Sequence, residues 1–198
     1  MPNPLNVRSL RQAWRRREVL DMYAMPVSPR RPEADSARQL REATAEVLTQ
    51  MRTDYPQDLN ERKYQLLLAR LDDPADRTLI IHDEDGTPCG YCHITTGDTV
   101  NARIRFRVRL RPHQAYFWDD HLFMAHRRKG LHSFSIARRL QLVAQDGITE
   151  VLTIISRPNV ASQQSFARFG VVRRRVLIYV PRWGRTIALP TFPRSRMR

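Results

Sequence analysis

The chain has 198 residues, of which 41% are hydrophobic, enough to bury one core of ordinary size. No apolar run is long enough to span a bilayer, no secretory signal is visible, and two cysteines are too few for a disulfide framework, so we expect a cytoplasmic protein. The net charge of +14 comes almost wholly from arginine, and no acidic residue accompanies the ten arginines after Glu150, which favours an acidic ligand or partner.

Composition divides the chain into a basic, proline-rich arm, one folded domain and a basic tail, at residues 1–33, 34–190 and 191–198. Within the arm, Val19–Val27 is predicted to be an opening strand. Asp35 or Ser36 is predicted to cap a first helix, and Asp58-x-x-Glu61 resembles the capping box of a second helix.

The rest of the domain is predicted to consist of strands joined by turns, with two further helices. One helix is predicted after Gly130, where apolar residues recur at helical spacing, and a short one after Asn159, which can cap it. The predicted strands are Thr78–His82, Pro88–Thr96, Arg103–Arg111, Gln114–Met124, Glu150–Ser156, Val171–Val180 and Arg185–Leu189.

Arginine alternates with apolar residues from Arg103 to Arg111, and this period of two would place five guanidinium groups on one face of a strand. That face is either an ordinary water-exposed face or a docking surface for an acidic protein partner. Five like charges in a row repel one another, so a row without a partner would be expected to mix signs, which favours the second interpretation.

Cys89-Gly90-Tyr91-Cys92 has the spacing of a redox pair, or of half a zinc site completed by His82 and His93. The segment is predicted to be a strand, in which residues three apart point to opposite faces. The sequence contains no second pair of this kind, so we expect no metal and no redox chemistry.

A predicted strand passes through the basic turn Arg127-Arg128-Lys129-Gly130 into a helix. Free backbone N–H groups, the positive end of the helix dipole and three cationic side chains together favour an anion site, with phosphate as the obvious ligand. Gly130 would let the backbone approach that phosphate closely, or adopt a positive φ. The alternative is an ordinary solvated surface turn.

Just before this turn, Asp119-Asp120-His121 lies near the end of an apolar, aromatic strand. Buried carboxylates and histidines are costly unless they are paired or used in function. Asp119 and Asp120 should point in opposite directions, so only one of them is expected to face a given cleft as a general base. The alternative is that one carboxylate caps a helix and the other is solvated.

The chain carries two motifs at a characteristic separation, Arg127-x-x-Gly130-x-His132 and Asn159-x-x-Ser162-x-x-x-Phe166-x-x-x-Gly170-Val171. They resemble the motifs of the GNAT superfamily of CoA-dependent N-acyltransferases, and the element order from Ser36 to Leu189 resembles that family too. The resemblance implies an α/β fold in which a mixed, mostly antiparallel sheet is flanked by helices and contains a splayed central strand pair.

By this resemblance, the first motif would hold the CoA pyrophosphate on backbone amides. The pantetheine arm would pair with the end of strand 114–124, where it splays from strand 150–156. The residues so implied in cofactor binding are Leu122, Phe123, Met124, Arg127, Arg128, Lys129, Gly130, Leu131, His132, Ser133, Asn159, Ser162 and Phe166. For the base that takes the amine proton we favour Asp120, with Asp119 and His121 as alternatives.

Two departures from the family pattern bear on function. His132 stands where the loop usually has a small residue, so either the turn is more crowded or the imidazole helps to bind phosphate. Phe166 stands where the family often has a tyrosine that protonates the leaving thiolate, so Ser162 or Ser165 is expected to substitute. This second departure keeps open a GNAT-like protein that binds a ligand but catalyses poorly.

The resemblance implies an N-acetyltransferase that moves an acetyl group from acetyl-CoA to a primary amine by direct attack. The acceptor would be a small-molecule or carrier-bound amine, and the protein a monomer or homodimer. An acyl carrier protein as donor also stays open. The alternative function is a basic module that docks on nucleic acid or another polyanion, although neither an aromatic stacking motif nor a helix-turn-helix pattern favours nucleic acid.

Overall fold

The computed structural model describes residues 14–28 and 37–191 of the chain. Most of the predicted arm and tail, and the two candidate caps Asp35 and Ser36, lie outside the described residues. None of the described helices is both long and apolar enough to cross a membrane.

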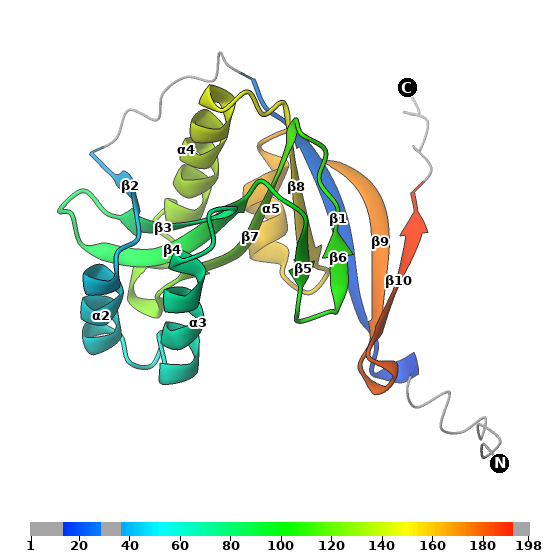
Figure 1. Cartoon of the computed structure of the whole chain (residues 1–198), viewed down its shortest axis with the longest axis horizontal. Helices are drawn as coiled ribbons and strands as arrows, with labels where there is room; N and C mark the ends of the chain where they lie inside the picture. Colours follow the sequence, from blue (N-terminus) through cyan, green and yellow to red (C-terminus); the bar gives the residue numbers. More distant parts are fainter. Residues whose placement is uncertain (1–13, 29–36, 192–198) are drawn as a thin grey trace.

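A sheet of eight strands forms the centre of the described structure, in the order β10-β9-β1-β8-β7-β4-β3-β2 (Figure 1). Its neighbouring strands are antiparallel except β7 and β8, which run parallel. The strands are β1 (Glu18–Pro26), β2 (Gln39–Glu42), β3 (Asp76–His82), β4 (Pro88–Thr95), β7 (Gln114–Leu122), β8 (Glu150–Ser156), β9 (Val172–Val180) and β10 (Arg185–Pro190). The mixed, mostly antiparallel sheet is the one that the family resemblance implied.

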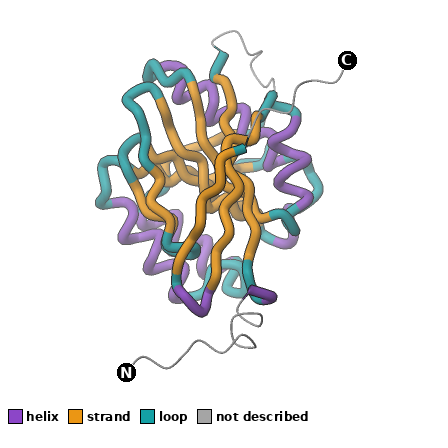
Figure 2. The backbone as a smooth tube through the Cα atoms, turned by 90° about the vertical axis from the view of Figure 1, so that its right-hand side faces the viewer, coloured by secondary structure: helices purple, strands orange, loops and turns teal. Residues whose placement is uncertain are grey.

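Short elements and helices complete the described fold. A separate hairpin is formed by β5 (Thr99–Asn101) and β6 (Phe106–Val108). The helices are α2 (Ala45–Asp54), α3 (Glu61–Leu71), α4 (Leu131–Gln145) and α5 (Val160–Ala167), with 3-10 turns η1 (Met124–His126) and η2 (Pro181–Trp183). Figure 2 shows helices on both sides of the strands.

The two faces of the sheet are covered differently, because alternate residues of each strand point to opposite faces. On one face, α4 and α5 bury a core that includes Ile81 and Phe117. On the other face, α2 and α3 cover β3 and β4 around Ile80, and the β5–β6 hairpin covers β1 and β8. Adjacent residues Ile80 and Ile81 thus belong to opposite cores, and each helix contributes one apolar side.

The parallel pair β7 and β8 separates partway along its length. The two strands pair only from Gln114, opposite Glu150, to Phe117, opposite Thr153. Beyond that point the last residues of β7 have no strand partner on the β8 side among the described residues. The splayed central pair is therefore confirmed, and it leaves backbone polar groups of β7 open to a ligand.

The opening strand predicted at Val19–Val27 is confirmed as β1, and it lies inside the sheet rather than at an edge. It pairs antiparallel with β8 on one side and with β9 on the other. The predicted final hairpin of β9 and β10 is also confirmed, and it extends the sheet outward from β1.

The predictions for the first two helices are partly wrong. Residues Gln39–Glu42 form β2 and pair with β3, and the first helix begins only after Thr44, whose side chain accepts a hydrogen bond from the Val47 N–H. Pairing with the edge of β3 thus outweighs the local helical pattern. Asn60, and not Asp58, caps the second helix.

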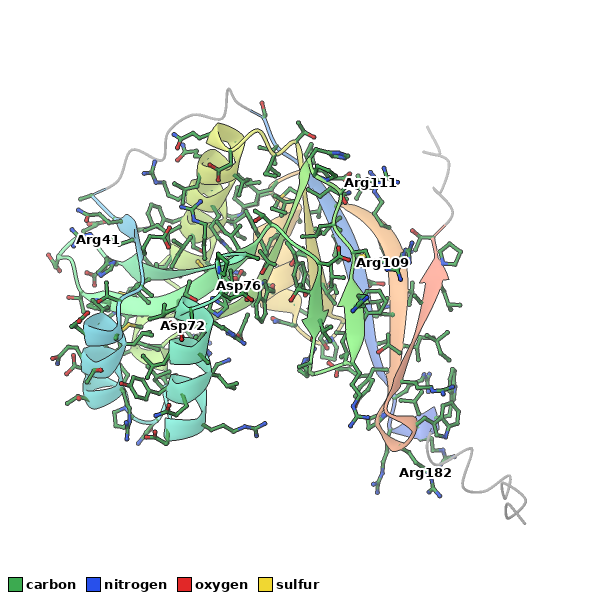
Figure 3. All side chains as sticks on the ribbon, viewed as in Figure 1. Arg41, Asp72, Asp76, Arg109, Arg111 and Arg182 are labelled. Atoms are coloured by element: carbon green, nitrogen blue, oxygen red, sulfur yellow. The ribbon has the colours of Figure 1, made fainter. Side chains whose placement is uncertain are left out.

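The arginine-rich segment is not one continuous strand. Residues 102–105 form a turn in which Arg105 has a φ of 48°, and only Phe106–Val108 is strand. The alternation nevertheless persists in burial, since Ile104 and Val108 are buried in the core and the arginines are exposed. Two of them, Arg109 and Arg111, lie on the side of the molecule with β6 and β9, away from α2 and α3 (Figure 3).

Candidate active site

A β-bulge in β7 organises the centre of the site. Tyr91 of β4 pairs with His121, and His93 pairs with Trp118, so that two residues of β7 oppose one residue of β4. Asp119, within the bulge, has a φ of 51°. Such an extra residue bends a strand and redirects its side chains, and bulges are frequent beside active sites.

Gly90 permits this bend because β4 approaches the bulged strand very closely. A Cβ atom at Gly90 would overlap the carbonyl oxygen of His121 and lie 2.9 Å from Leu122 Cα. Only glycine fits at this position without moving the backbone of β7.

Asp119 points toward the α3 side of the sheet. Its carboxylate accepts hydrogen bonds from Lys63 Nζ at 2.8 and 2.9 Å and from Arg70 at 2.6 Å. Burial would raise the pKa of this carboxyl, but Lys63 and Arg70 outweigh burial and lower the pKa below its ordinary value. Asp119 therefore stays ionised and neutralises part of the local positive charge.

Asp120 points to the opposite side, toward α4. Its Oδ2 accepts hydrogen bonds from Arg139, at 2.6 Å, and from the His132 Nε2, at 3.0 Å. Burial would raise the pKa of the Asp120 carboxyl, but the charge of the fully buried Arg139 and the bond from His132 hold it at about 2. A carboxylate this acidic is a poor acceptor for an amine proton, so its geometry suits holding His132 in place rather than general base catalysis.

His121 faces the α3 side and lies against Tyr91, with ring centroids 5.3 Å apart. Its Nε2 is 3.3 Å from Asp58 Oδ1, and the other oxygen of Asp58 accepts the Met124 N–H at 3.1 Å. Burial lowers the pKa of His121, and Asp58 offsets this only in part. The imidazole is thus neutral at pH 7, is held by a carboxylate, and can accept a proton.

The basic turn leads into α4 as the sequence predicted, but the preceding strand β7 ends at Leu122 and η1 stands between it and the turn. Gly130 has a φ of 77° and occupies the N-cap position, where no side chain of a described residue caps the helix. The first N–H groups of α4 are therefore open to an anion, at the positive end of the helix dipole. Arg127 Nε donates to the Leu122 carbonyl at 3.0 Å, which ties the turn to the end of β7.

A first cavity of about 620 Å³ opens between this turn, the end of β7 and α5. Nine of the implied cofactor residues line it, namely Leu122, Arg127, Arg128, Gly130, Leu131, His132, Ser133, Asn159 and Ser162, together with Asp120, His121 and Ser165. Asn159 also caps α5, accepting the Ser162 N–H at 3.2 Å. Ser165 Oγ donates to the Ala161 carbonyl at 3.0 Å and lies at the cavity wall.

Four of the implied cofactor residues lie outside this lining. Phe123 is buried against Tyr55 in the α2–α3 core, whereas Met124 and Lys129 are exposed. Phe166 is buried beneath His132, with ring centroids 5.6 Å apart in an edge-on arrangement. It therefore supports the imidazole from below, which no sequence motif indicated.

A second cavity of about 340 Å³ opens on the α3 side. Its lining residues are Asp58, Asn60, Arg62, Lys63, Leu66, Tyr91, Asp119 and His121. The Tyr91 hydroxyl is buried and has no hydrogen-bond partner among the described residues. His121 lines both cavities, so the two meet at this residue of β7.

Several residues of this arrangement were not singled out from the sequence. They are Lys63, Arg70, Arg139, Tyr91 as a lining residue, and Asp58 as the partner of His121. They come from elements far apart in the chain, and no spacing within the sequence links them. The capping-box pattern at Asp58 pointed to a different role.

Comparison with known proteins identifies the family. A model of the acetyltransferase (GNAT) family matches residues 42–171, well over half of the chain. The chain belongs to this family. No curated protein sequence matches it significantly. Membership of the GNAT family supports acyltransferase activity in general terms.

Solved structures share the fold at low sequence identity. The GCN5-related N-acetyltransferase from Sphaerobacter thermophilus matches with a TM-score of 0.56 and 10% identity, over 88% of this chain and 52% of that one, so this chain spans about half of that protein. The GCN5-related N-acetyltransferase from Kribbella flavida matches with a TM-score of 0.51 and 15% identity, over 96% of this chain and 65% of that one. The spermidine N-acetyltransferase from Vibrio cholerae, in complex with CoA and spermine, matches with a TM-score of 0.51 and 15% identity, over 69% of this chain and 81% of that one.

Proposed function

We propose that the protein transfers an acetyl group from acetyl-CoA to a primary amine by direct attack. The observation that carries this proposal is the meeting of two cavities at His121, one with a basic helix start and one without. A two-substrate reaction without a covalent enzyme intermediate requires both substrates to reach one point at the same time.

The first cavity suits the donor. The pyrophosphate of CoA would accept hydrogen bonds from the open N–H groups at the start of α4, and Arg127 and Arg128 would add positive charge. The amides of the pantetheine arm would pair with the backbone of β7 beyond Phe117, where β8 has separated from it. The thioester would then lie near His121. The V. cholerae relative, which was solved with CoA, supports this donor.

The second cavity suits the acceptor amine. His121 would take a proton from the attacking amine, and Asp58 would hold the imidazole in place. The N–C bond would form as the amine attacks the thioester carbonyl. The carbonyl oxygen would accept a hydrogen bond from a backbone N–H of β7, and the C–S bond would then break. The leaving thiolate would take its proton from Ser165 or Ser162 at the cavity wall, directly or through water.

Charges in the second cavity favour an acceptor that carries an acidic group. Asp119 is already bonded to Lys63 and Arg70, and Arg62 has no ion-pair partner among the described residues. These cations also disfavour a second positive charge nearby, which helps to keep the amine neutral for attack. An acidic or carrier-bound amine therefore fits better than the polyamine named for the V. cholerae relative.

Calorimetry with acetyl-CoA tests the donor site directly. We expect micromolar binding to the full chain, lost in Gly130→Glu because a carboxylate would then stand where the pyrophosphate binds. A screen of amine acceptors that follows CoA release should find turnover with acidic amines first. Absence of acetyl-CoA binding to the wild-type chain would contradict the proposal.

A second candidate function rests on the exposed arginines. Arg107, Arg109 and Arg111, together with Arg175 and Arg182 of the β9–β10 hairpin, are exposed, and none forms an ion pair among the described residues. A basic module that docks on an acidic protein or on nucleic acid would use this surface. Salt-sensitive binding to such a polyanion, without acetyl-CoA binding, would favour this candidate over the enzyme.

A further inference from the structure

Three potential metal ligands from separate segments meet behind the basic turn. Asp83 lies in the turn between β3 and β4, Cys89 lies on β4, and His126 ends η1. One ligand atom from each lies within 4.8 Å of the other two. All three residues lie outside the two cavities described above.

A second bulge creates this cluster. Gly90 pairs with Ile81 and Pro88 pairs with His82, so Cys89 is an unpaired extra residue in β4. Because of this extra residue, Cys89 and Cys92 belong to the same core, and the expectation that they point to opposite faces is wrong. The partners of Cys89 are therefore Asp83 and His126, rather than Cys92, His82 and His93.

The contacts within the cluster are close. Cys89 Sγ is 3.0 Å from His126 Nδ1, which is 3.9 Å from an oxygen of Asp83. The other nitrogen of His126 is 3.0 Å from the Tyr55 hydroxyl. Cys89 is fully buried and His126 nearly so, whereas 22% of the Asp83 side chain is exposed.

We propose that Asp83, Cys89 and His126 bind a Zn²⁺ ion. Thiolate sulfur, imidazole nitrogen and carboxylate oxygen are all ligands that Zn²⁺ accepts, and three protein ligands plus one water complete a tetrahedral site. The water enters from the Asp83 side, where the cluster reaches solvent. Tyr55 supplies the outer hydrogen bond that orients a metal-bound imidazole.

Proton release accompanies binding. Burial raises the pKa of Cys89 to about 12, followed in importance by the Asp83 charge, so the thiol is protonated at neutral pH. His126 is neutral there, because burial and Lys129 lower its pKa, and Asp83 is ionised. Zinc binds cysteine as the thiolate, so binding displaces one proton from Cys89 to solvent.

The ion would fasten the basic turn to the sheet. His126 directly precedes Arg127, and the other two ligands belong to the β3–β4 hairpin. A bound ion would therefore limit the motion of the segment that enters the first cavity, at a distance from any reacting atom.

Titration of the metal-free full chain with Zn²⁺ tests the site, and the two cysteines provide a matched pair of variants. Both are fully buried in one core, so Cys89→Ala and Cys92→Ala remove the same group from similar surroundings. We expect calorimetry to give one Zn²⁺ per wild-type or Cys92→Ala chain. Cys89→Ala should weaken binding by at least about 100-fold.

Co²⁺ provides a readout that does not depend on stability. A cobalt–thiolate bond gives a near-ultraviolet charge-transfer band, which should appear in the wild type and Cys92→Ala and be absent from Cys89→Ala. His126→Gln, with circular dichroism as a folding check, serves if Cys89→Ala does not fold. A Zn²⁺ stoichiometry other than one ion per wild-type chain, or an equal Zn²⁺ affinity in Cys89→Ala and the wild type, would overturn the proposal.

Discussion

The two cavities that meet at His121 differ in how their cations are used. In the first cavity, Arg128 forms no ion pair among the described residues and lies beside an uncapped helix start. In the second, Lys63 and Arg70 are bound to Asp119. Open positive charge suits a phosphate ligand, whereas in the second cavity Asp119 takes up the charge of Lys63 and Arg70, and Arg62 is the lining cation without an ion pair among the described residues. The same residue types thus create two environments on opposite faces of β7.

The adjacent residues Asp119 and Asp120 show the same contrast at smaller scale. The bulge sends one toward each cavity, and each is ionised for a different reason. Asp120 is fixed by a buried arginine, and Asp119 by two partly exposed cations. Neither is free to accept a proton near neutral pH, which is why the proposed mechanism uses His121 as the base.

The largest effect is expected from His121→Gln. Loss of the base should lower kcat by about 100- to 10,000-fold, while acetyl-CoA affinity changes little because the donor contacts remain. Steady-state kinetics together with calorimetry separate the two quantities. His113→Gln, at an exposed histidine outside both cavities, is the control. Unchanged turnover in His121→Gln would show that the cavities do not meet at a catalytic base.

Asp120→Asn should act mainly on stability. It leaves the buried Arg139 without its counter-charge, and such a change costs about 3–5 kcal/mol of unfolding free energy. Urea denaturation measures this loss. Asp119→Asn, at a carboxylate whose side chain is 25% exposed, should cost clearly less. Equal losses in both variants would remove the distinction between the two carboxylates.

Lowering the pH should destabilise the α3 side through His93. Burial and the nearby Arg70 lower the pKa of His93 to about 3, so the folded protein takes up this proton only at a lower pH than the unfolded chain does. Unfolding free energy should therefore fall by about 1.4 kcal/mol per pH unit below pH 6.5, down to the folded pKa. Denaturation at pH 7, 6 and 5 gives the slope, which His93→Gln should reduce by that amount.

The smallest effect is expected from Arg128→Asn. Removing one charge from the first cavity should weaken acetyl-CoA binding about tenfold, as expected for one charged hydrogen bond. Asparagine is chosen because it tolerates the φ of 64° found at Arg128. Calorimetry at two salt concentrations measures the change, and kcat at saturating donor should stay the same. A fall in kcat without a loss of acetyl-CoA affinity would indicate that Arg128 acts on the reacting atoms rather than on the pyrophosphate.

How far the sequence predicted these features depended on distance along the chain. Gly130 and Asn159 act within short motifs, so the residues around them could be placed on a helix start from local pattern alone. The first helix was expected to begin at Asp35 or Ser36, but pairing with β3 makes Gln39–Glu42 a strand.

The sequence analysis did not predict the two bulges, although Gly90 within the predicted strand Pro88–Thr96 is the kind of residue that marks one. Cys89 leaves the strand ladder, and Asp119 adopts a positive φ, because of how β3, β4 and β7 fit together. Simple alternation along a regular strand would give Cys89 and Asp119 the wrong partners, because each residue lies at a bulge. The pairing of Asp58 with His121 depends on the same three-dimensional fit.

The position of β1 has a consequence for the order of folding. Glu18–Pro26 leaves the ribosome well before its partners, because β8 and β9 are synthesised more than 120 residues later. Until they emerge, this apolar strand has both edges unpaired. Contacts between residues so distant in sequence slow folding, and they prolong the time during which unpaired, aggregation-prone strand edges are exposed. We expect the nascent chain to need protection over this interval, and the N-terminal strand to join the sheet among its last elements.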